Sequence, residues 1–295
     1  MAPTVVSPRV ANERRCLLGE SPRWDPDGAR VAWIDILAGQ VHLHPLTGGP
    51  TRSLTVGGRV GGLLLRAGGA GYVVGQERSV RLLDPDGRVE ATLVEEVPGD
   101  GRGLRINECA VDPAGRLVFG VMTGDKEPGT GALWRRERSG DLRLLRQDLT
   151  ISNGMGWTAD GRYLYHVDSP THRVVRLPYG DDGCGEPEVV ATVEEDAGVP
   201  DGLCVDAEDG FWVAVNGGGQ CRHFSATGAE THRVELPAKA TASCVLVDGG
   251  GDPQLFVTSG CSGMTEADLL EEPAAGYLFS ADVPQAPAPP TFYPG

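Results

Sequence analysis

Four residues of the sequence carry an oxygen-bearing side chain at nearly the same distance before a predicted β-strand. Glu20, Asn107, Asn153 and Asp201 each precede a short apolar run by 10 or 11 residues. Carboxylate and amide oxygens are the ligands that hard divalent cations such as Ca²⁺, Mg²⁺ and Mn²⁺ prefer. If the spacing reflects a structural register, these side chains meet in an oxygen-rich cup of net negative charge.

Other kinds of chemistry find less support in the same register. No histidine or cysteine shares it, so a structural zinc site is not expected, although zinc in a catalytic oxygen site stays open. The sequence has neither a Gly-x-Ser-x-Gly elbow nor a His-Glu-x-x-His motif. Each of the four residues alone would be an ordinary turn or cap residue. Their shared position favours a site.

The strands that must position these residues recur at a regular interval. Their first residues, numbers 31, 72, 117, 164, 211 and 255, are separated by 41, 45, 47, 47 and 44 positions. A unit of about 45 residues with about four short strands has the size of a propeller blade. The predicted fold class is therefore all-β, a six-bladed β-propeller with four-stranded blades. A large β-sandwich, the alternative, would not repeat at this period.

The ends of the chain must close such a ring. We expect one domain over residues 1–295, in which residues 4–16 pair with residues 276–280 in the last blade. Residues 283–295 are rich in Pro and Ala and are expected to form an extended tail. The first strand of each blade lines the channel, which places the cup at one mouth. The two remaining positions of the register are Gly61 and, approximately, Ser243.

Composition limits the function classes. The formal net charge of −15 excludes the basic face that a nucleic-acid-binding protein needs. No apolar segment of 18 residues suggests a membrane span, and no signal peptide is apparent. Seven cysteines without a CxxC motif predict reduced thiols and a cytoplasmic location. We expect a monomer or dimer that acts on a small molecule, with neither nucleic acid nor membrane as partner.

Several residues outside the register are given structural roles. His42 and His44, two apart on one strand, are expected to form a surface pair. His166 is expected to be a hydrogen-bonded core histidine. Residues 168–169 are expected to form a turn at the edge of a blade. The glycine run 217–219 predicts a wide turn, because the helix and lysine of a phosphate-binding loop are missing.

In these motifs the sequence resembles the SMP-30/gluconolactonase family, whose members include regucalcin-like and luciferin-regenerating-enzyme-like proteins. The resemblance spans nearly the whole chain. It rests on the ordered set of residues 19–24 (GESPRW), 111–116, 151–154, 200–208 and 269–276. It implies a six-bladed propeller that binds one divalent cation in its channel. Many members hydrolyse sugar lactones.

The resemblance also implies roles for individual residues. The family's metal ligands match Glu20, Asn153 and Asp201, and its substrate-binding arginine and asparagine match Arg105 and Asn107. One divalent cation is expected as cofactor, with Ca²⁺ as the first choice and Mn²⁺, Mg²⁺ and Zn²⁺ as alternatives.

Two departures from the family pattern concern the substrate. Glu108 stands where the family usually has aspartate, and it reaches one methylene further. The loop that follows Met122 lacks the glutamate of some sugar lactonases, and Asp125 or Glu127 could replace it. We therefore expect Glu108 and Asp125, with Arg105 and Asn107, to contact the substrate.

The expected function is metal-dependent hydrolysis of a small lactone similar to a sugar aldonolactone. The cation would polarise the carbonyl and activate water, with Asp201 as general base. One alternative is a biosynthetic member of the same fold that closes or rearranges a ring of a specialised metabolite. A second alternative is a cation-binding propeller without catalysis.

Overall fold

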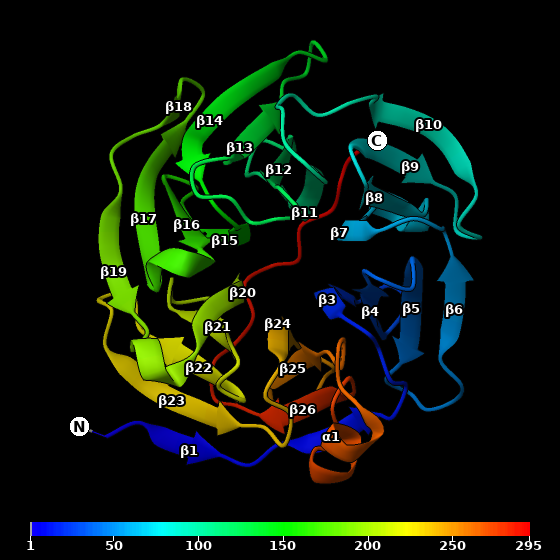
Figure 1. Cartoon of the computed structure of the whole chain (residues 1–295), viewed down its shortest axis with the longest axis vertical. Helices are drawn as coiled ribbons and strands as arrows, with labels where there is room; N and C mark the ends of the chain where they lie inside the picture. Colours follow the sequence, from blue (N-terminus) through cyan, green and yellow to red (C-terminus); the bar gives the residue numbers. More distant parts are fainter. Residues whose placement is uncertain (1) are drawn as a thin grey trace.

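The chain forms a six-bladed β-propeller, as the repeat predicts. The computed structural model describes residues 2–295, and it arranges six antiparallel sheets in a ring. In Figure 1, viewed down the shortest axis, the first strand of each blade surrounds the central channel. These inner strands are β3 (Gly19–Asp25), β7 (Val60–Leu65), β11 (Arg105–Val111), β15 (Ser152–Trp157), β20 (Val199–Val205) and β24 (Thr241–Val247).

The remaining strands follow outward in chain order. Blade 1 adds β4 (Arg30–Asp35), β5 (Gln40–Pro45) and β6 (Arg52–Thr55), and blade 2 adds β8 (Tyr72–Gln76), β9 (Ser79–Leu83) and β10 (Val89–Val94). Blade 3 adds β12 (Leu117–Met122), β13 (Gly131–Arg136) and β14 (Leu142–Leu149). Blade 4 adds β16 (Tyr163–Asp168), β17 (Arg173–Gly180), β18 (Gly183–Cys184) and β19 (Glu188–Thr192). Blade 5 adds β21 (Phe211–Asn216), β22 (Gln220–Phe224) and β23 (Glu230–Glu235), and blade 6 adds β25 (Gln254–Ser259) and β26 (Leu278–Asp282).

The predicted closure of the ring is confirmed in blade 6. Strand β2 (Arg9–Asn12) pairs antiparallel with β26 and becomes the outer strand of that blade. The prediction is wrong for residues 4–6, which form a separate strand, β1 (Thr4–Val6). This strand pairs parallel with β23 and adds a fifth strand to blade 5. The N-terminal segment therefore joins two neighbouring blades.

The core lies between neighbouring blades, where the apolar faces of adjacent sheets meet. The second strands supply the most deeply buried aromatic residues, including Trp33, Phe119 and Trp212. His42 belongs to this interior: it is 1% exposed, and its ring lies 5.1 Å from the Trp33 ring. The predicted surface pair is therefore wrong for His42, because it lies on the same face of the sheet as Trp33, which packs against blade 6. His44 is only partly buried.

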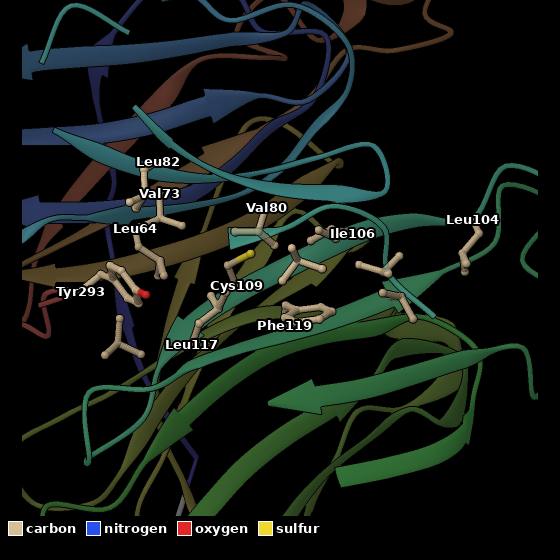
Figure 2. Close-up of a cluster of buried hydrophobic side chains, with 14 residues drawn as sticks. Leu64, Val73, Val80, Leu82, Leu104, Ile106, Cys109, Leu117, Phe119 and Tyr293 are labelled. Carbon is tan, nitrogen blue, oxygen red and sulfur yellow. The ribbon is translucent and has the colours of Figure 1, made fainter. Parts of the chain in front are cut away.

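The C-terminal tail crosses the end of the channel formed by the turns between first and second strands. In Figure 1 it runs through the centre of the ring. Tyr293 N–H donates to Leu65 O at 2.9 Å, and its carbonyl accepts from Ala67 N–H. The Tyr293 side chain is 6% exposed and packs with Leu64 and Leu117, as Figure 2 shows. The predicted extended tail is thus a strap, anchored at the base of the channel.

Helix contributes little. Among residues 2–295 the one α-helix, α1 (Glu266–Glu271), lies in the β25–β26 connection, where a Thr265–Asp268 capping box begins it. None of the helices in this part of the chain has the length and apolarity that a membrane span requires.

Candidate active site

Each inner strand breaks its pairing with the second strand at the position that the register singled out. The register shifts fall at Glu20/Arg23, Val60/Gly62, Ile106/Glu108, Ser152/Met155, Pro200/Leu203 and Thr241/Ser243. Such β-bulges bend a strand and re-aim a side chain. Asn107, Asn153 and Asp201 lie within these bulges, and Glu20 borders one. The sixth bulge holds Ala242, whereas Ser243 is paired in the sheet, so the register ends without an oxygen ligand there.

Local sequence explains why the strands bulge. Ser21, next to Glu20, has φ of +44°, a conformation that non-glycine residues rarely adopt. Gly154 and Gly202 follow Asn153 and Asp201. A Cβ at Gly154 would lie 2.5 Å from Leu203 N, and one at Gly202 would overlap Ser243. Glycine therefore lets adjacent inner strands approach each other beside Asn153 and Asp201.

Asn107 and Asn153 form a hydrogen-bonded chain of amides. The Asn107 Nδ2 group donates to Asn153 Oδ1 at 3.0 Å and to the Ser152 carbonyl at 3.0 Å. The Asn153 Nδ2 group donates to Ser169 Oγ at 2.9 Å. These bonds fix which end of the Asn153 amide is oxygen, and Oδ1 keeps one lone pair free.

Asp201 is held on one side only. Asn216 at the end of β21 donates from Nδ2 to Asp201 Oδ2 at 2.9 Å. Asp201 Oδ1 is buried and has no hydrogen-bond partner within residues 2–295. Burial raises the pKa of Asp201 to about 7, the negative charge of Glu108 adds to the rise, and the Asn216 hydrogen bond opposes it. A buried carboxylate with one unsatisfied oxygen is costly unless a cation or proton completes it.

Glu20 and Glu108 complete the acidic floor. Burial raises the pKa of Glu20 well above its ordinary value, and the charges of Asp201 and Glu108 raise it further. Glu108 Oε1 accepts from Ser21 Oγ, Arg23 Nη2 and the Cys109 N–H at 3.2, 3.1 and 2.9 Å. The sequence anticipated a substrate contact at Glu108. That contact remains a prediction; in the structure, Glu108 Oε1 ties blade 1 to blade 3.

Arg105 is a buried cation whose charge acts on the acids of the cup. Its Nη1 group donates to the carbonyl of Ile106 at 2.9 Å, and no carboxylate within residues 2–295 forms an ion pair with it. Burial and the charge of Arg59 lower the pKa of Arg105, whereas Glu20 and Asp201 act in the opposite direction. The guanidinium thus lies within electrostatic range of two ligand candidates and keeps free N–H groups.

The loop after β12 carries two acids, and both are exposed to solvent. Asp125 and Glu127 are exposed, and the Asp125 carboxylate is engaged with Thr123, whose hydrogen bond lowers the pKa of Asp125. The residue of this loop whose charge reaches the cup is Lys126, which lowers the pKa of Asp201. The predicted substrate contact at Asp125 remains a prediction.

The donor set fits a hard divalent cation. No group of three His, Cys, Asp or Glu side chains in residues 2–295 gathers closely enough to bind a metal by itself. A site here would therefore also draw on the amide of Asn153. Glu20, Asn153 and Asp201 each retain acceptor capacity, and the partnerless Oδ1 of Asp201 is the observation that most favours a cation.

Sequence reasoning missed the residues that support the ligands from the second strands. The Asp168 carboxylate accepts the N–H groups of Thr150 and Ile151, and Asp35 does the same for Leu17 and Leu18. Each carboxylate thereby fixes the backbone of the two residues that come just before an inner strand. The signal was present, because both predicted strand cores end in Asp. Residues 168–169, predicted as an edge turn, thus serve the site directly through Ser169.

Comparison with known proteins identifies the family and supports the fold. The family model described as the SMP-30/Gluconolactonase/LRE-like region matches residues 18–261. Regucalcin of Xenopus laevis is 33% identical over 276 residues, 89% of each chain. A pentonolactonase of Haloferax volcanii is 31% identical over 276 residues, 91% of each chain. The solved structure of regucalcin from Agrobacterium tumefaciens covers 99% of both chains with a TM-score of 0.88 at 24% identity, which supports the fold.

Proposed function

Since the chain belongs to the SMP-30/Gluconolactonase/LRE-like family, we propose that it is a divalent-metal-dependent hydrolase of a small lactone of the sugar aldonolactone type. Relatives named as lactonases support lactone hydrolysis in general. The support for metal dependence and for the roles of individual residues comes from the structure of the cup. The observation that carries them is the buried Asp201 Oδ1 without a partner.

The residues that would hold the metal are Glu20, Asn153 and Asp201. When bound, a divalent cation supplies Lewis-acid polarisation of a carbonyl oxygen and raises the acidity of nearby water. Its charge also offsets the mutual repulsion of Glu20, Asp201 and Glu108. The oxygen-only donor set favours Ca²⁺, Mn²⁺ or Mg²⁺.

Asp201 is the residue proposed to move a proton. Opening a lactone requires water to lose a proton as it attacks the carbonyl carbon. A base is most effective when its pKa lies near the working pH. Burial raises the pKa of Asp201 to about 7 in the metal-free protein, and a bound cation would lower it from there. Each carboxylate oxygen offers two lone-pair positions, so Oδ1 can face the cation and accept the proton.

Arg105 and Asn107 are proposed to orient the substrate. The free N–H groups of Arg105 can donate to a hydroxyl or ring oxygen of the lactone. Both Nδ2 bonds of Asn107 are committed to the Asn153 strand, which leaves its Oδ1 to accept from a sugar hydroxyl. Two fixed contacts would hold the lactone carbonyl over the cup.

A hydrolysis assay with a pH indicator tests the proposal. The protein is stripped of metal and given five- and six-membered sugar lactones with and without Ca²⁺, Mn²⁺, Mg²⁺ or Zn²⁺. We expect turnover that returns only with metal and that Asn153→Ala abolishes. Metal binding that raises the Tm without turnover on any lactone would instead favour ring closure or rearrangement of a specialised metabolite. Full activity after chelation would refute the metal dependence.

A further inference from the structure

Asn216 holds an unusual place in the ring. Its backbone is fixed from two sides, since it pairs with Val199 of the inner strand of its own blade and forms a bridge to Ala240, just before the inner strand of blade 6. Its side chain leaves this fixed point and reaches Asp201, at an Nδ2–Oδ2 distance of 2.9 Å. The amide therefore has little freedom to move away from the carboxylate.

The glycine run that follows makes this anchoring possible. Gly217 and Gly219 have φ of +85° and +61°, in the left-handed region, and their N–H groups both donate to the carbonyl of Lys239. A Cβ at Gly218 would overlap the Ala197 carbonyl. The turn thus packs closely against residues on both sides, and it starts at Asn216. The three glycines therefore shape the turn that begins at Asn216.

We infer that Asn216 is a positioning residue that occupies Asp201 Oδ2, so that Oδ1 alone is presented to the cup. This inference rests on the proposed function for the roles of Asp201. Without the amide donor the carboxylate could rotate, and its two oxygens would become equivalent. A group fixed by a second hydrogen-bond partner binds metal and reacts from one geometry.

Residues at corresponding strand ends in other blades show that the fold alone does not require such a contact. Gln76 ends β8 and donates from Nε2 to the carbonyls of Val56 and Gly57. Ser259 ends β25 and donates to the carbonyl of Tyr277. Both side chains hold loops. Asn216 instead donates its amide N–H to Asp201, an acid of the cup.

The test compares two replacements of a strand-end amide by an apolar side chain. Asn216→Leu removes the donor beside Asp201, and Gln76→Met removes a donor that holds only a loop. The full chain is stripped of metal and titrated with Ca²⁺ and with Mn²⁺ in a calorimeter. The Tm of each metal-free variant and kcat and KM on a sugar lactone are also measured. Asn216→Ser retains a donor and serves as the second variant if Asn216→Leu does not fold.

We expect Asn216→Leu to weaken metal binding about 10- to 100-fold, the range typical of a lost partner behind a metal ligand. Its kcat should fall at least about tenfold with KM within about twofold, because the base and not the substrate contact is disturbed. Gln76→Met should leave both constants near wild type, and Asn216→Ser should lie between Asn216→Leu and wild type.

Metal affinity and kcat of Asn216→Leu within about twofold of wild type would overturn the positioning role while leaving the proposed function intact. A wild-type protein that hydrolyses lactones without metal would refute the metal dependence, and the kcat of Asn216→Leu would still decide the inference. A wild-type protein with neither metal binding nor turnover would overturn both.

Discussion

Two buried aspartates at opposite ends of the same blade differ in how many donors they receive. Asp206, at the base, accepts the N–H groups of Glu208 and Gly210 at 2.8 and 2.9 Å on one oxygen and meets His223 Nε2 at 2.7 Å with the other. Asp201, at the mouth, has the single bond from Asn216. The two are 3% and 7% exposed.

Donors decide the direction of the pKa shift at Asp206, whereas burial decides it at Asp201. Burial raises the pKa of Asp206, but the His223 contact and the N–H donors outweigh it, so the net shift is downward. The pKa of Asp201 rises to about 7. Asp206, at the base of blade 5, therefore stabilises the fold when it is ionised. Ionised Asp201, at the mouth, lowers the stability of the metal-free protein. Such unsatisfied groups persist at functional sites.

The largest expected effect concerns catalysis. Asp201→Asn should lower kcat about 10³-fold, because it removes the proposed base and one charge of the cup. Asp206→Asn should leave the kcat of the folded protein within about threefold. Steady-state kinetics with saturating metal measures both. Equal losses in the two variants would show that the ends of the blade do not differ in function.

A second prediction concerns the strap at the base. Tyr293→Ala should lower the free energy of unfolding by about 3 kcal/mol, because it empties a buried aromatic site between blades 2 and 3. Urea unfolding checks this, with the exposed Pro290→Ala as control. The kcat and KM of the folded variant should not change. A large change in kcat would mean that the base takes part in the reaction.

Replacing the aspartate at each end of blade 5 by asparagine should change the free energy of unfolding in opposite directions. In the metal-free protein at pH 8, Asp201→Asn should raise the free energy of unfolding by about 2 kcal/mol, whereas Asp206→Asn should lower it by a similar amount. A raised folded-state pKa means that stability is lost as pH rises from the ordinary value of 3.8 towards 7. A lowered pKa means that the stability is present above the ordinary value and is lost as pH falls.

Urea unfolding at pH 5 and pH 8 checks these signs. The gain from Asp201→Asn should shrink at pH 5, where the folded protein already holds most of that proton. The loss from Asp206→Asn should persist, because Asp206 stays ionised at pH 5. A gain from Asp201→Asn that is equal at both pH values would contradict the raised pKa.

The smallest expected effect sharpens the comparison within the mouth. Ser169→Ala should weaken metal binding about tenfold, because the amide of Asn153 loses the acceptor that fixes its orientation. Thr171→Ala, in the same short turn, removes a hydroxyl that bonds to the Asp168 carbonyl and should leave the affinity unchanged. Calorimetric titration with Ca²⁺ measures both variants. If both variants weakened metal binding equally, Ser169 would act by stabilising the turn and not by orienting Asn153.

Local patterns were enough to predict the propeller. Apolar strand cores, Asp-Gly turns and the repeat of about 45 residues are properties of neighbouring residues, and they specify the blades before any long-range contact is known. The N-terminal partner of residues 276–280 was also predictable, because a ring must close. The register of Glu20, Asn107, Asn153 and Asp201 followed from the same repeat.

The features that the sequence did not predict depend on contacts between different strands and blades. His42 is buried because of a neighbouring blade, and β1 joins blade 5 through a pairing that no local pattern marks. Whether an aspartate is a turn residue or a reactive acid depends on how many donors reach it. Sequence determined which oxygen-bearing residues lie at or beside the bulges of the inner strands. Only the tertiary structure decided that Asp206 is satisfied and Asp201 is not, because hydrogen-bond donors such as Asn216 and His223 are brought in by strands folded back from elsewhere in the sequence.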